Sequence, residues 1–485
     1  MNDMALALLI DFGSTFTKIQ AIDLEAEEIV AYAQSCTTVE TDIMVGLRGA
    51  LDLLPARVRN SAFSCKLSSS SAAGGLGMVT IGLIPELSAE AARRAALGAG
   101  AKVIKVYAFR LSAKELQELE SLNPDILLLA GGTDGGNADV ILENAKKLAS
   151  SRVHCPIVIA GNKVAADEVN AILSASGKPT LVTDNVMPEV NVINVEPARE
   201  MIRRVFIERI IEAKGLKRAE AFVEGILMPT PTAVLKAARL LSQGTPREKG
   251  LGDLVIVDVG GATTDVHSIG LGSPCQAGVI FKGLPEPLAK RTVEGDLGIR
   301  YNAKSILRLR GPERLLRNAS LETDRLAPKI EALCRNVEFL PQTEEDMQLD
   351  LALATCAAQA AMERHAGTIE AVWGPQGQYY IQHGKDLTEV CHLIGTGGIF
   401  THHPEAGLIL RKTLFSSAEP FSLRPKQPSL YTDAKYCLYA IGLLADRYPD
   451  QALRIAIKYL KKWESTIRTS GASPEPKKSA ARDGE

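Results

Sequence analysis

One pattern occurs twice in this chain of 485 residues and constrains its fold more than any other feature. Residues 6–25 read LALLIDFGSTFTKIQAIDLE, and residues 253–272 read DLVIVDVGGATTDVHSIGLG. Each segment begins as an apolar strand, turns after an aspartate through glycine and hydroxyl residues, and continues as a second strand. The glycines permit the positive φ angles of a tight turn and let a ligand approach the backbone closely. The repeat therefore predicts two β-hairpins, one in each half of the chain.

Both hairpins carry the residue types that hold a phosphate chain together with a cation. Backbone N–H groups of glycine-rich turns, together with side-chain hydroxyls, bind phosphate directly. Aspartates repel phosphate, so Asp11 and Asp258 indicate a divalent cation or a water molecule between carboxylate and phosphate. Mg²⁺ keeps most of its waters and takes few carboxylates besides phosphate oxygens. The hairpins therefore predict a phosphate chain held between two similar α/β lobes.

Length and composition set the outer limits of this interpretation. Because single hydrophobic cores stop growing at about 250–300 residues, two or more domains are expected. A net charge of -2 and an aromatic content of 5% argue against a nucleic-acid partner. No run reaches the ~18 apolar residues of a membrane-spanning helix, and the N-terminus lacks signal-peptide features, so a cytoplasmic location is expected. The eight cysteines form no CxxC pair and are expected to be structural thiols, and His402–His403 to be part of a loop.

Three further segments fit a chain of two lobes, one of them between the two hairpins and two after the second hairpin. MPTPTAVLKAARLLSQG (228–244) and YTDAKYCLYAIGLLAD (431–446) are apolar helical runs. In the second run, Ala440 and Gly442 are small enough for two helices to cross closely. HLIGTGGIFTH (392–402) is an apolar strand ending in glycines, which is either a bare turn or a place where a nucleotide can lie against the backbone.

Together with the hairpins, these segments resemble the phosphate, adenosine and connecting-helix motifs of the superfamily of actin, sugar kinases and heat-shock chaperone ATPases. The resemblance implies an α/β fold with two actin-like (ribonuclease H-like) lobes and a cleft that binds ATP and Mg²⁺. It implies that Asp11 and Asp258 are the catalytic residues and hold Mg²⁺ through water. It further implies nucleotide contacts from Gly13, Ser14, Thr15, Lys18, Gly260, Gly261, Thr263, Gly395, Gly397 and Gly398.

One position departs from the chaperone pattern. Thr230 stands where chaperone ATPases carry a glutamate, and the nearest acid, Glu224, is expected to lie a strand away. Slow hydrolysis, or hydrolysis through another base, is the consequence. The P-loop pattern G-x-x-x-x-G-K-[ST] is absent, so the other common ATPase design is not supported.

Residues 98–200 alternate strands and helices, which predicts parallel βαβ units inserted in the first lobe. Ligands bind at the carboxyl ends of strands in such sheets, which is where AGGTDGG (130–136) falls. This turn is either a ligand site or an ordinary βα turn in which Asn137 caps the next helix. SAAGGLGM (71–78) also has two interpretations, a mobile loop or a ligand contact.

Four sequence segments in the first half of the chain narrow the resemblance to one family. SSAAGGLGM (70–78), IPELSAEAARRAALGAGAKV (84–103), LLLAGGTDGGN (127–137) and DNVMPEVNVINVEPARE (184–200) resemble the accessory proteins of adenosylcobalamin-dependent glutamate mutase, called GlmL or MutL. The resemblance covers most of residues 5–445. It implies an ATP-dependent reactivating or assembly chaperone whose partners are mutase subunits. It leaves open which mutase is the client, whether the chain forms a homodimer, and whether cobalamin is contacted.

The expected organisation is a first lobe over residues 1–248, a second lobe over 249–445, and a C-terminal helix with a disordered tail over 446–485. Within the second lobe, a helical subdomain is expected over about 283–366 and a connecting helix over 432–446 that returns to the first lobe. A slow Mg²⁺-dependent ATPase is the expected activity. A small-molecule kinase of the same superfamily and a non-enzymatic nucleotide-binding scaffold are the alternatives.

Overall fold

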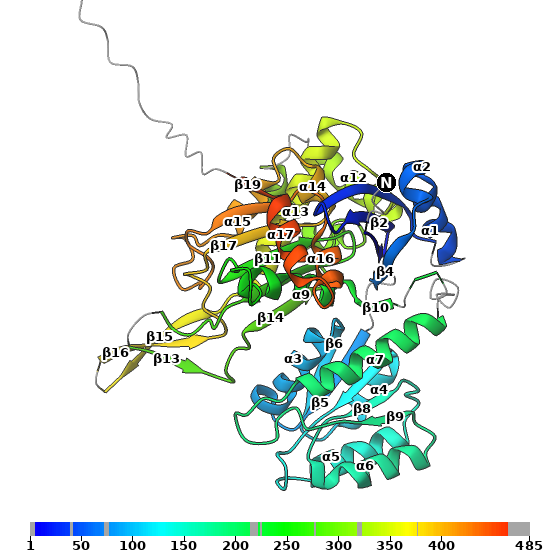
Figure 1. The fold of residues 1–485 in the computed structure, drawn as a ribbon. Coiled ribbons are helices and arrows are strands. Elements are labelled where there is room, and N and C mark those ends of the chain that lie inside the picture. Colours follow the sequence, from blue (N-terminus) through cyan, green and yellow to red (C-terminus); the bar gives the residue numbers. More distant parts are fainter. Residues whose placement is uncertain are drawn as a thin grey trace, which may run out of the picture.

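A computed structural model describes residues 5–38, 42–71, 77–213, 222–223, 226–275, 278–317, 323–375 and 377–463. It contains two lobes and an inserted α/β domain that lies below them (Figure 1). The expected disordered tail after residue 463 and most of the SAAGGLGM segment fall outside the described residues. No described helix combines the length and the apolar composition needed to cross a membrane.

The first lobe is built on a five-stranded sheet in the order β10-β4-β1-β2-β3. Its strands are β1 (Leu6–Phe12), β2 (Phe16–Asp23), β3 (Glu28–Cys36), β4 (Phe63–Ser70) and β10 (Ile226–Pro229). The first three form an antiparallel meander, while β4 pairs parallel with β1 and with β10. All seven residues of β1 are buried, as its continuous apolar run predicts. Two helices cover the outer face, α1 (Ile43–Asp52) and α2 (Ala56–Arg59).

The second lobe repeats this topology. Its sheet has the order β14-β12-β11-β17-β18-β19, with β11 (Leu254–Val259), β12 (Thr264–Ile269), β14 (Ala289–Glu294), β17 (His392–Thr396), β18 (Ser429–Asp433) and β19 (Leu460–Trp463). Strands β11, β12 and β14 form the meander, and β17 and β18 continue the sheet in parallel from β11. The two central hairpins, β1–β2 and β11–β12, therefore occupy equivalent places in matching sheets.

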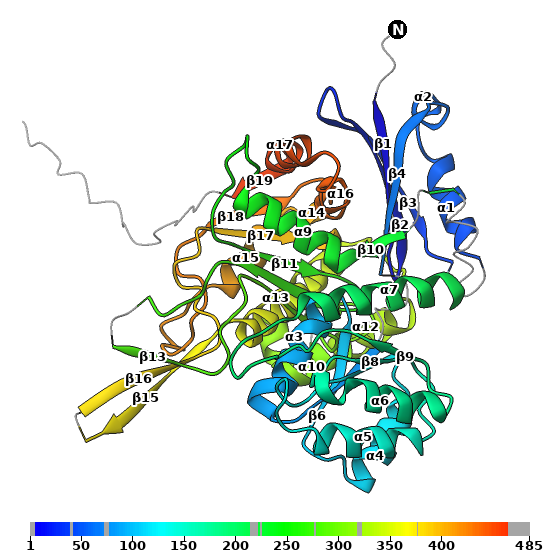
Figure 2. The ribbon, with the colours of Figure 1, turned by 60° about the horizontal axis from the view of Figure 1, so that its bottom comes forward.

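Three helices fill the space between the two sheets, namely α9 (Thr230–Gln243), α16 (Leu438–Leu444) and α17 (Pro449–Tyr459). Figure 2 shows α9 and α16 between the strands of the first lobe and those of the second, and one hydrophobic cluster joins all three helices to both sheets. A Cβ atom at Gly442 would overlap the carbonyl of Ala233. The small residue expected at this helix crossing is thus required by contact between the two backbones.

The C-terminal helix ends earlier than its apolar periodicity suggests. Residues 460–463 leave α17 and form β19, which pairs antiparallel with β18. The Trp463 ring covers Gly407, and its Nε1 donates to Thr432 Oγ1 at 3.1 Å. This tertiary pairing outweighs the helical pattern of the sequence there.

The inserted domain contains a five-stranded parallel sheet in the order β6-β5-β7-β8-β9. Its strands are β5 (Gly77–Gly82), β6 (Lys102–Ala108), β7 (Ile126–Leu129), β8 (Ile157–Ile159) and β9 (Thr180–Val182), so the sheet already begins before residue 98. The helices are η1 (Pro85–Ala89), α3 (Glu90–Gly98), α4 (Ala113–Leu122), α5 (Asp139–Ala149), α6 (Lys163–Ala175) and α7 (Glu196–Ala213). This strand order is the flavodoxin-like doubly wound one.

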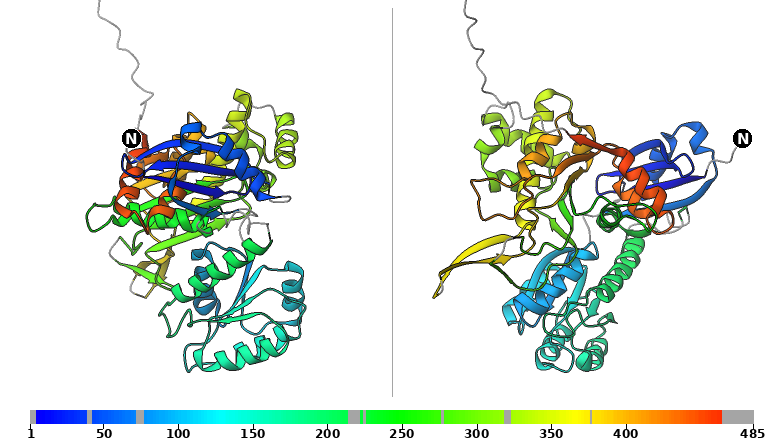
Figure 3. Two further views of the ribbon diagram at one scale, coloured as in Figure 1. Left: turned by 45° about the vertical axis from the view of Figure 1, so that its right-hand side comes forward. Right: turned by 60° about the vertical axis from the view of Figure 1, so that its left-hand side comes forward.

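Helices and a small sheet complete the second lobe. The helical subdomain comprises α10 (Ala303–Arg310), α11 (Pro312–Leu316), α12 (Thr323–Arg335) and α13 (Glu344–His365), whereas the earlier part of the expected 283–366 segment contributes strand β14. Short helices α14 (Gly398–His402) and α15 (Gly407–Thr413) follow β17. Strands β13 (Val279–Lys282), β15 (Thr368–Gly374) and β16 (Gly377–His383) form a separate sheet that projects from the body (Figure 3, right).

Candidate nucleotide site

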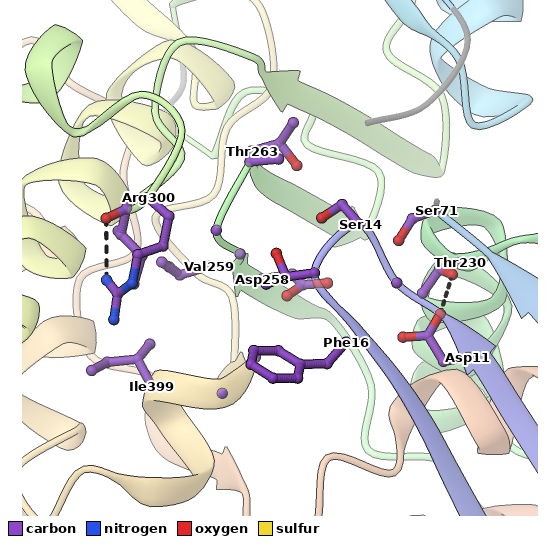
Figure 4. Close-up of a pocket in the computed structure, with 18 of the residues that line it drawn as sticks. Asp11, Ser14, Phe16, Ser71, Thr230, Asp258, Val259, Thr263, Arg300 and Ile399 are labelled. Atoms are coloured by element: carbon purple, nitrogen blue, oxygen red, sulfur yellow. Dashed lines mark hydrogen bonds between the residues drawn. The ribbon is translucent and has the colours of Figure 1, made fainter. Parts of the chain in front are cut away.

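A cavity of about 540 Å³ lies between the two hairpins. It is lined by most residues that the sequence assigns to the nucleotide, namely Asp11, Gly13, Ser14, Thr15, Lys18, Asp258, Gly260, Gly261, Thr263, Gly397 and Gly398. Figure 4 shows Asp258 between the Ser14 and Asp11 side of the cavity and the Thr263 and Arg300 side. The two turns come close, since a Cβ atom at Gly261 would lie 3.5 Å from Thr15 Oγ1.

Gly395 has a different role from the one the sequence assigns to it. It lies within β17 and is absent from the lining of the cavity. A Cβ atom there would overlap the ring of Phe400, which is almost fully buried in the core of the second lobe. This glycine is therefore needed for packing behind the site. Gly397, by contrast, has φ +109°, and a Cβ atom there would lie 3.2 Å from Asp258 Oδ1 and overlap the Val259 carbonyl.

The first hairpin holds its aspartate within a complete set of partners. Asp11 lies opposite Lys18 in the β1–β2 register. Thr230 donates to Asp11 Oδ1 at 2.6 Å, and the Tyr436 hydroxyl donates to Oδ2 at 3.3 Å. Burial raises the pKa of Asp11, while Lys18 and these hydrogen bonds act in the opposite direction. Thr230, which replaces the glutamate of the chaperone pattern, thus touches the first-lobe aspartate directly.

Lys18 is the cation of the first hairpin. Its Nζ lies 3.5 Å from the centroid of the Tyr436 ring. Burial lowers the pKa of Lys18, and the carboxylates of Asp11, Asp258 and Asp433 oppose that shift. Tyr436 itself has φ +51°, an uncommon conformation for a bulky residue that marks a constrained position. The ammonium is therefore placed between acids of both lobes.

The second hairpin leaves its first aspartate facing the cavity. Asp258 lies opposite Asp265 in the β11–β12 register. Asp265 is neutralised by Arg291, with 2.6 Å between Arg291 Nη2 and Asp265 Oδ1, and it also accepts a hydrogen bond from Thr263. Within the described residues, no comparable hydrogen bond reaches Asp258. Burial, followed by repulsion from Asp265, raises the pKa of Asp258 to about 7.

The oxygen atoms that line the cavity suit a hard divalent cation. Carboxylates of Asp11 and Asp258 and hydroxyls of Ser14, Thr15 and Thr263 line one cavity, and oxygen is the ligand type that Mg²⁺ prefers. The described residues contain no group of three or more His, Cys, Asp or Glu side chains that could hold a metal by themselves. A cation here would thus complete its shell with phosphate oxygens and water.

The cavity continues beyond the hairpins to an apolar wall that the sequence did not reveal. Val337, Phe339, Leu340, Met347 and Ile399 line this side. Below them, Arg300 forms a bidentate pair with Asp350, at 2.8 and 2.6 Å. The residues come from the α12–α13 connection, α13 and α14, so only the folded chain brings them together. The wall offers a hydrophobic surface of the kind that a planar base covers.

The AGGTDGG turn and the arginines of the helical subdomain lie away from this cavity. The AGGTDGG turn is closed by its own domain: Asn162 Oδ1 accepts from Gly135 N at 3.1 Å, and Asn185 Nδ2 donates to Gly132 O at 3.0 Å. Asn137 Oδ1 accepts from Val140 N at 3.2 Å, although Ala138 and not Asn137 is the N-cap residue of α5. In the helical subdomain, Arg310 and Arg314 bond to Glu363 and Gln359. Of the histidine pair, both members line the cavity.

Comparison with known proteins gives the family. The model of the MutL protein family matches residues 7–460. Protein MutL of Clostridium tetanomorphum is 51% identical over 461 residues, covering 94% of this chain and 99% of that protein. Similar solved structures include nucleotide-free acetone carboxylase (14% identity, 91% of this chain and 70% of that one, TM-score 0.39) and xylulose kinase from Bifidobacterium adolescentis (11% identity, 93% of each chain, TM-score 0.30). The two lobes of matching sheet topology around a shared cavity form the two-lobed α/β fold that the motifs predict. By the family and sequence matches, the chain belongs to the MutL family.

Proposed function

We propose that this protein is an ATP-dependent reactivating or assembly chaperone for an adenosylcobalamin-dependent aminomutase such as glutamate (methylaspartate) mutase. The observation that carries the proposal is that two acidic hairpins, from lobes of matching topology, line one cavity. Membership of the MutL family supports mutase subunits as the partners. The cytoplasm is the proposed location, and a homodimer is one assembly to be tested.

Each side of the cleft has a distinct task when Mg-ATP binds. Ser14, Thr15 and Lys18 contact the β- or γ-phosphate, while Gly260, Gly261 and Thr263 hold the opposite side of the phosphate chain. Asp11 would hold Mg²⁺ through water, and Asp258 would hold the cation or orient the attacking water. Mg²⁺, when bound, supplies charge neutralisation between phosphate and carboxylates. Gly397 and Gly398 border the adenosine, whereas Gly395 supports them from the core.

The same residues support slow turnover. Thr230 cannot accept a proton as a glutamate would, and its hydroxyl is engaged by Asp11. Asp258 is the stronger candidate for the base, because it lines the cavity without the hydroxyl donors that Thr230 and Tyr436 give to Asp11. Hydrolysis therefore depends on the second hairpin more than on the first.

Nucleotide-driven closure of the two lobes is the proposed switch. A ligand shifts a conformational equilibrium only by its differential affinity for the two states. Phosphate contacts from both hairpins exist together only when the lobes approach each other, so ATP favours the closed state. Helices α9 and α16, which cross at Gly442, lie at the junction about which the lobes would move.

ATP hydrolysis measured with and without the holo-mutase tests this function. We expect slow basal hydrolysis and clear stimulation by the mutase. The absence of stimulation, combined with phosphate transfer to a metabolite, would replace the chaperone by a small-molecule kinase. Mg-ATP binding with no turnover in either condition would favour a nucleotide-binding scaffold. The observation that supports this alternative is that residue 230 is a threonine and not an acid. Co-purification from the native source identifies the client.

A further inference from the structure

Besides Phe206 of α7, the inserted domain reaches the cleft through a short segment, Leu97–Lys102, between the end of α3 and the start of β6. Gly100 and Lys102 line the cavity together with the hairpin residues. Gly100 has φ +97°, and a Cβ atom there would lie 2.8 Å from Pro229 Cβ and from Thr232 Oγ1. The segment therefore forms part of the floor of the cleft, pressed against the start of α9.

Arg291 connects this segment to the second hairpin. Its Nη1 donates to the carbonyl of Leu97 at 2.8 Å and to that of Ala101 at 3.3 Å. Its Nε donates to Asp265 Oδ1 at 2.9 Å, and only 2% of the Arg291 side chain is exposed. Arg291 thus holds the last turn of α3 with one part of its guanidinium and the hairpin with the other.

Asp265 extends the connection to the cavity itself. The Thr263 hydroxyl donates to Asp265 Oδ2 at 3.0 Å, and Thr263 lines the cavity at the turn between β11 and β12. A hydroxyl has a single proton to donate. If that proton goes to a phosphate oxygen, Asp265 loses one of its donors and depends more on Arg291. Phosphate binding at the turn therefore changes the interaction between Asp265 and the Arg291 guanidinium.

The first lobe reaches the same segment by an equally short path. Thr230, the first residue of α9, donates to Asp11, and Thr232 in the same turn donates to the carbonyl of Ala99 at 3.3 Å. Both aspartate-bearing hairpins are thus linked to the six residues Leu97–Lys102, the first hairpin through Thr230 and Thr232 of α9 and the second through Arg291 of β14. Such convergence places the insertion where it can respond to the approach of the two lobes.

We propose that Arg291 is a positioning residue through which the cleft and the inserted domain set each other's position. Phosphate bound at Thr263 strengthens the hold of Asp265 on Arg291 and changes how Arg291 holds the carbonyls of Leu97 and Ala101. The inserted domain then moves or tightens with nucleotide occupancy. This inference rests on the proposed binding of nucleotide in the cleft, and it makes the insertion the moving part that a client would sense.

The test measures amide hydrogen exchange of residues 97–108 in the full chain, with and without Mg²⁺ and a non-hydrolysable ATP analogue. Calorimetry of the same samples gives the affinity for the analogue. In the wild type, we expect the analogue to change the exchange rate of this segment by about fivefold or more, the lower range of allosteric coupling. In Arg291→Met, we expect the change to disappear while the analogue still binds.

Arg94→Met is the matched control. Arg94 lies on α3 and also joins the insertion to the second lobe, through Pro285 O at 2.6 Å and Glu286 Oε1 at 3.1 Å, but it does not line the cavity. We expect Arg94→Met to keep the response to the analogue. Because Arg291→Met leaves the buried Asp265 carboxylate without its cation, Arg291→Met/Asp265→Asn serves as the second variant if the single one does not fold.

The outcomes separate this inference from the proposed function. If the wild type gives no heat of binding, the proposed function fails and the inference fails with it. If the analogue binds and residues 97–108 do not respond, the inference alone is wrong. A response that persists in Arg291→Met, or that is lost equally in Arg94→Met, also overturns it, because the signal then bypasses Arg291.

Discussion

In the first lobe, Asp11 accepts hydrogen bonds from Thr230 and Tyr436 and lies opposite the cation Lys18. In the second lobe, Asp258 lies opposite another acid, Asp265, at the equivalent register. Arg291 forms an ion pair with Asp265. The two hairpins therefore share a topology and differ in charge balance. One hairpin is already satisfied by protein groups, and the other leaves a carboxylate for a ligand to complete.

The two hairpins look equivalent in the sequence, but this difference in charge balance gives them different roles. A carboxylate with hydrogen-bond donors and a nearby ammonium keeps its position when the site changes occupancy. A carboxylate with a pKa raised to about 7 changes its charge when a cation arrives. We therefore expect the first hairpin to position ligands and the second to respond to them.

The largest effect should come from Asp258→Ala. Removal of this carboxylate should lower ATP hydrolysis by about 100-fold or more, the usual range for loss of a general base, and make nucleotide binding independent of Mg²⁺. Steady-state hydrolysis and binding with and without EDTA are the measurements. Asp52→Ala, at an exposed position in α1, is the control and should behave as the wild type. If hydrolysis and Mg²⁺-dependent binding both survive in Asp258→Ala, the assignment of the site is wrong.

The equivalent glycines of the two turns offer a structural version of the comparison. A Cβ atom at Gly13 would lie 2.6 Å from the Phe16 carbonyl, and one at Gly260 would lie 3.2 Å from that of Thr263. Gly13→Ala should therefore reduce the free energy of unfolding by about 1–3 kcal/mol, and Gly260→Ala by less than about 1 kcal/mol. Urea unfolding of the two variants decides. Equal losses would show that the two turns are equally tight.

The raised pKa of Asp258 predicts a pH dependence of cation binding at the second hairpin. Because the pKa in the folded protein is raised above its ordinary value of 3.8 to about 7, the folded state binds this proton more tightly, and the associated stability is lost as pH rises from about 4 through 7. A cation must displace the same proton below pH 7. Apparent Mg²⁺ affinity should therefore be about tenfold weaker at pH 6 than at pH 8.

Asp258→Asn is the reference for this measurement. The ratio of wild-type to variant affinity at each pH cancels the titration of the nucleotide itself. We expect the ratio to rise between pH 6 and pH 8 and then level off. A flat ratio would mean that Asp258 is already ionised at pH 6.

The smallest effect should come from Tyr436→Phe, which sharpens the role of the first hairpin. The variant removes the 3.3 Å hydrogen bond to Asp11 Oδ2 and keeps the aromatic ring beneath Lys18. Loss of one hydrogen bond costs about 0.5–1.5 kcal/mol. Calorimetric affinity for Mg-ATP should fall by no more than about tenfold. A loss as large as that of Asp258→Ala would contradict the view that protein groups already satisfy the first hairpin.

Much of the site was predictable because its central parts are local. Each hairpin is a strand, a turn and a strand written in about twenty residues, and the glycines and hydroxyls of the turns occupy the cavity where the pattern predicts them. The close crossing of α9 and α16 also follows from a local signal, the small residue Gly442 in an apolar helix.

What the sequence did not predict depends on distant contacts. Tyr436 and Asp11 are 425 positions apart, and the bond from Arg291 to Leu97 spans 194. Gly395 shows a second limit, because a glycine chosen for packing against Phe400 looks the same in sequence as one chosen for a ligand. Strand β19 shows a third, since a helical pattern gives way to pairing with β18.

The most direct test of the central claim, that both hairpins hold one cation-bridged nucleotide, is anomalous diffraction from crystals grown with Mn²⁺ and a non-hydrolysable ATP analogue. We expect a single manganese peak within the cavity, adjacent to the phosphate chain and joined to Asp11 and Asp258 directly or through water. Nucleotide bound outside this cavity, or manganese that approaches neither carboxylate, would contradict the account.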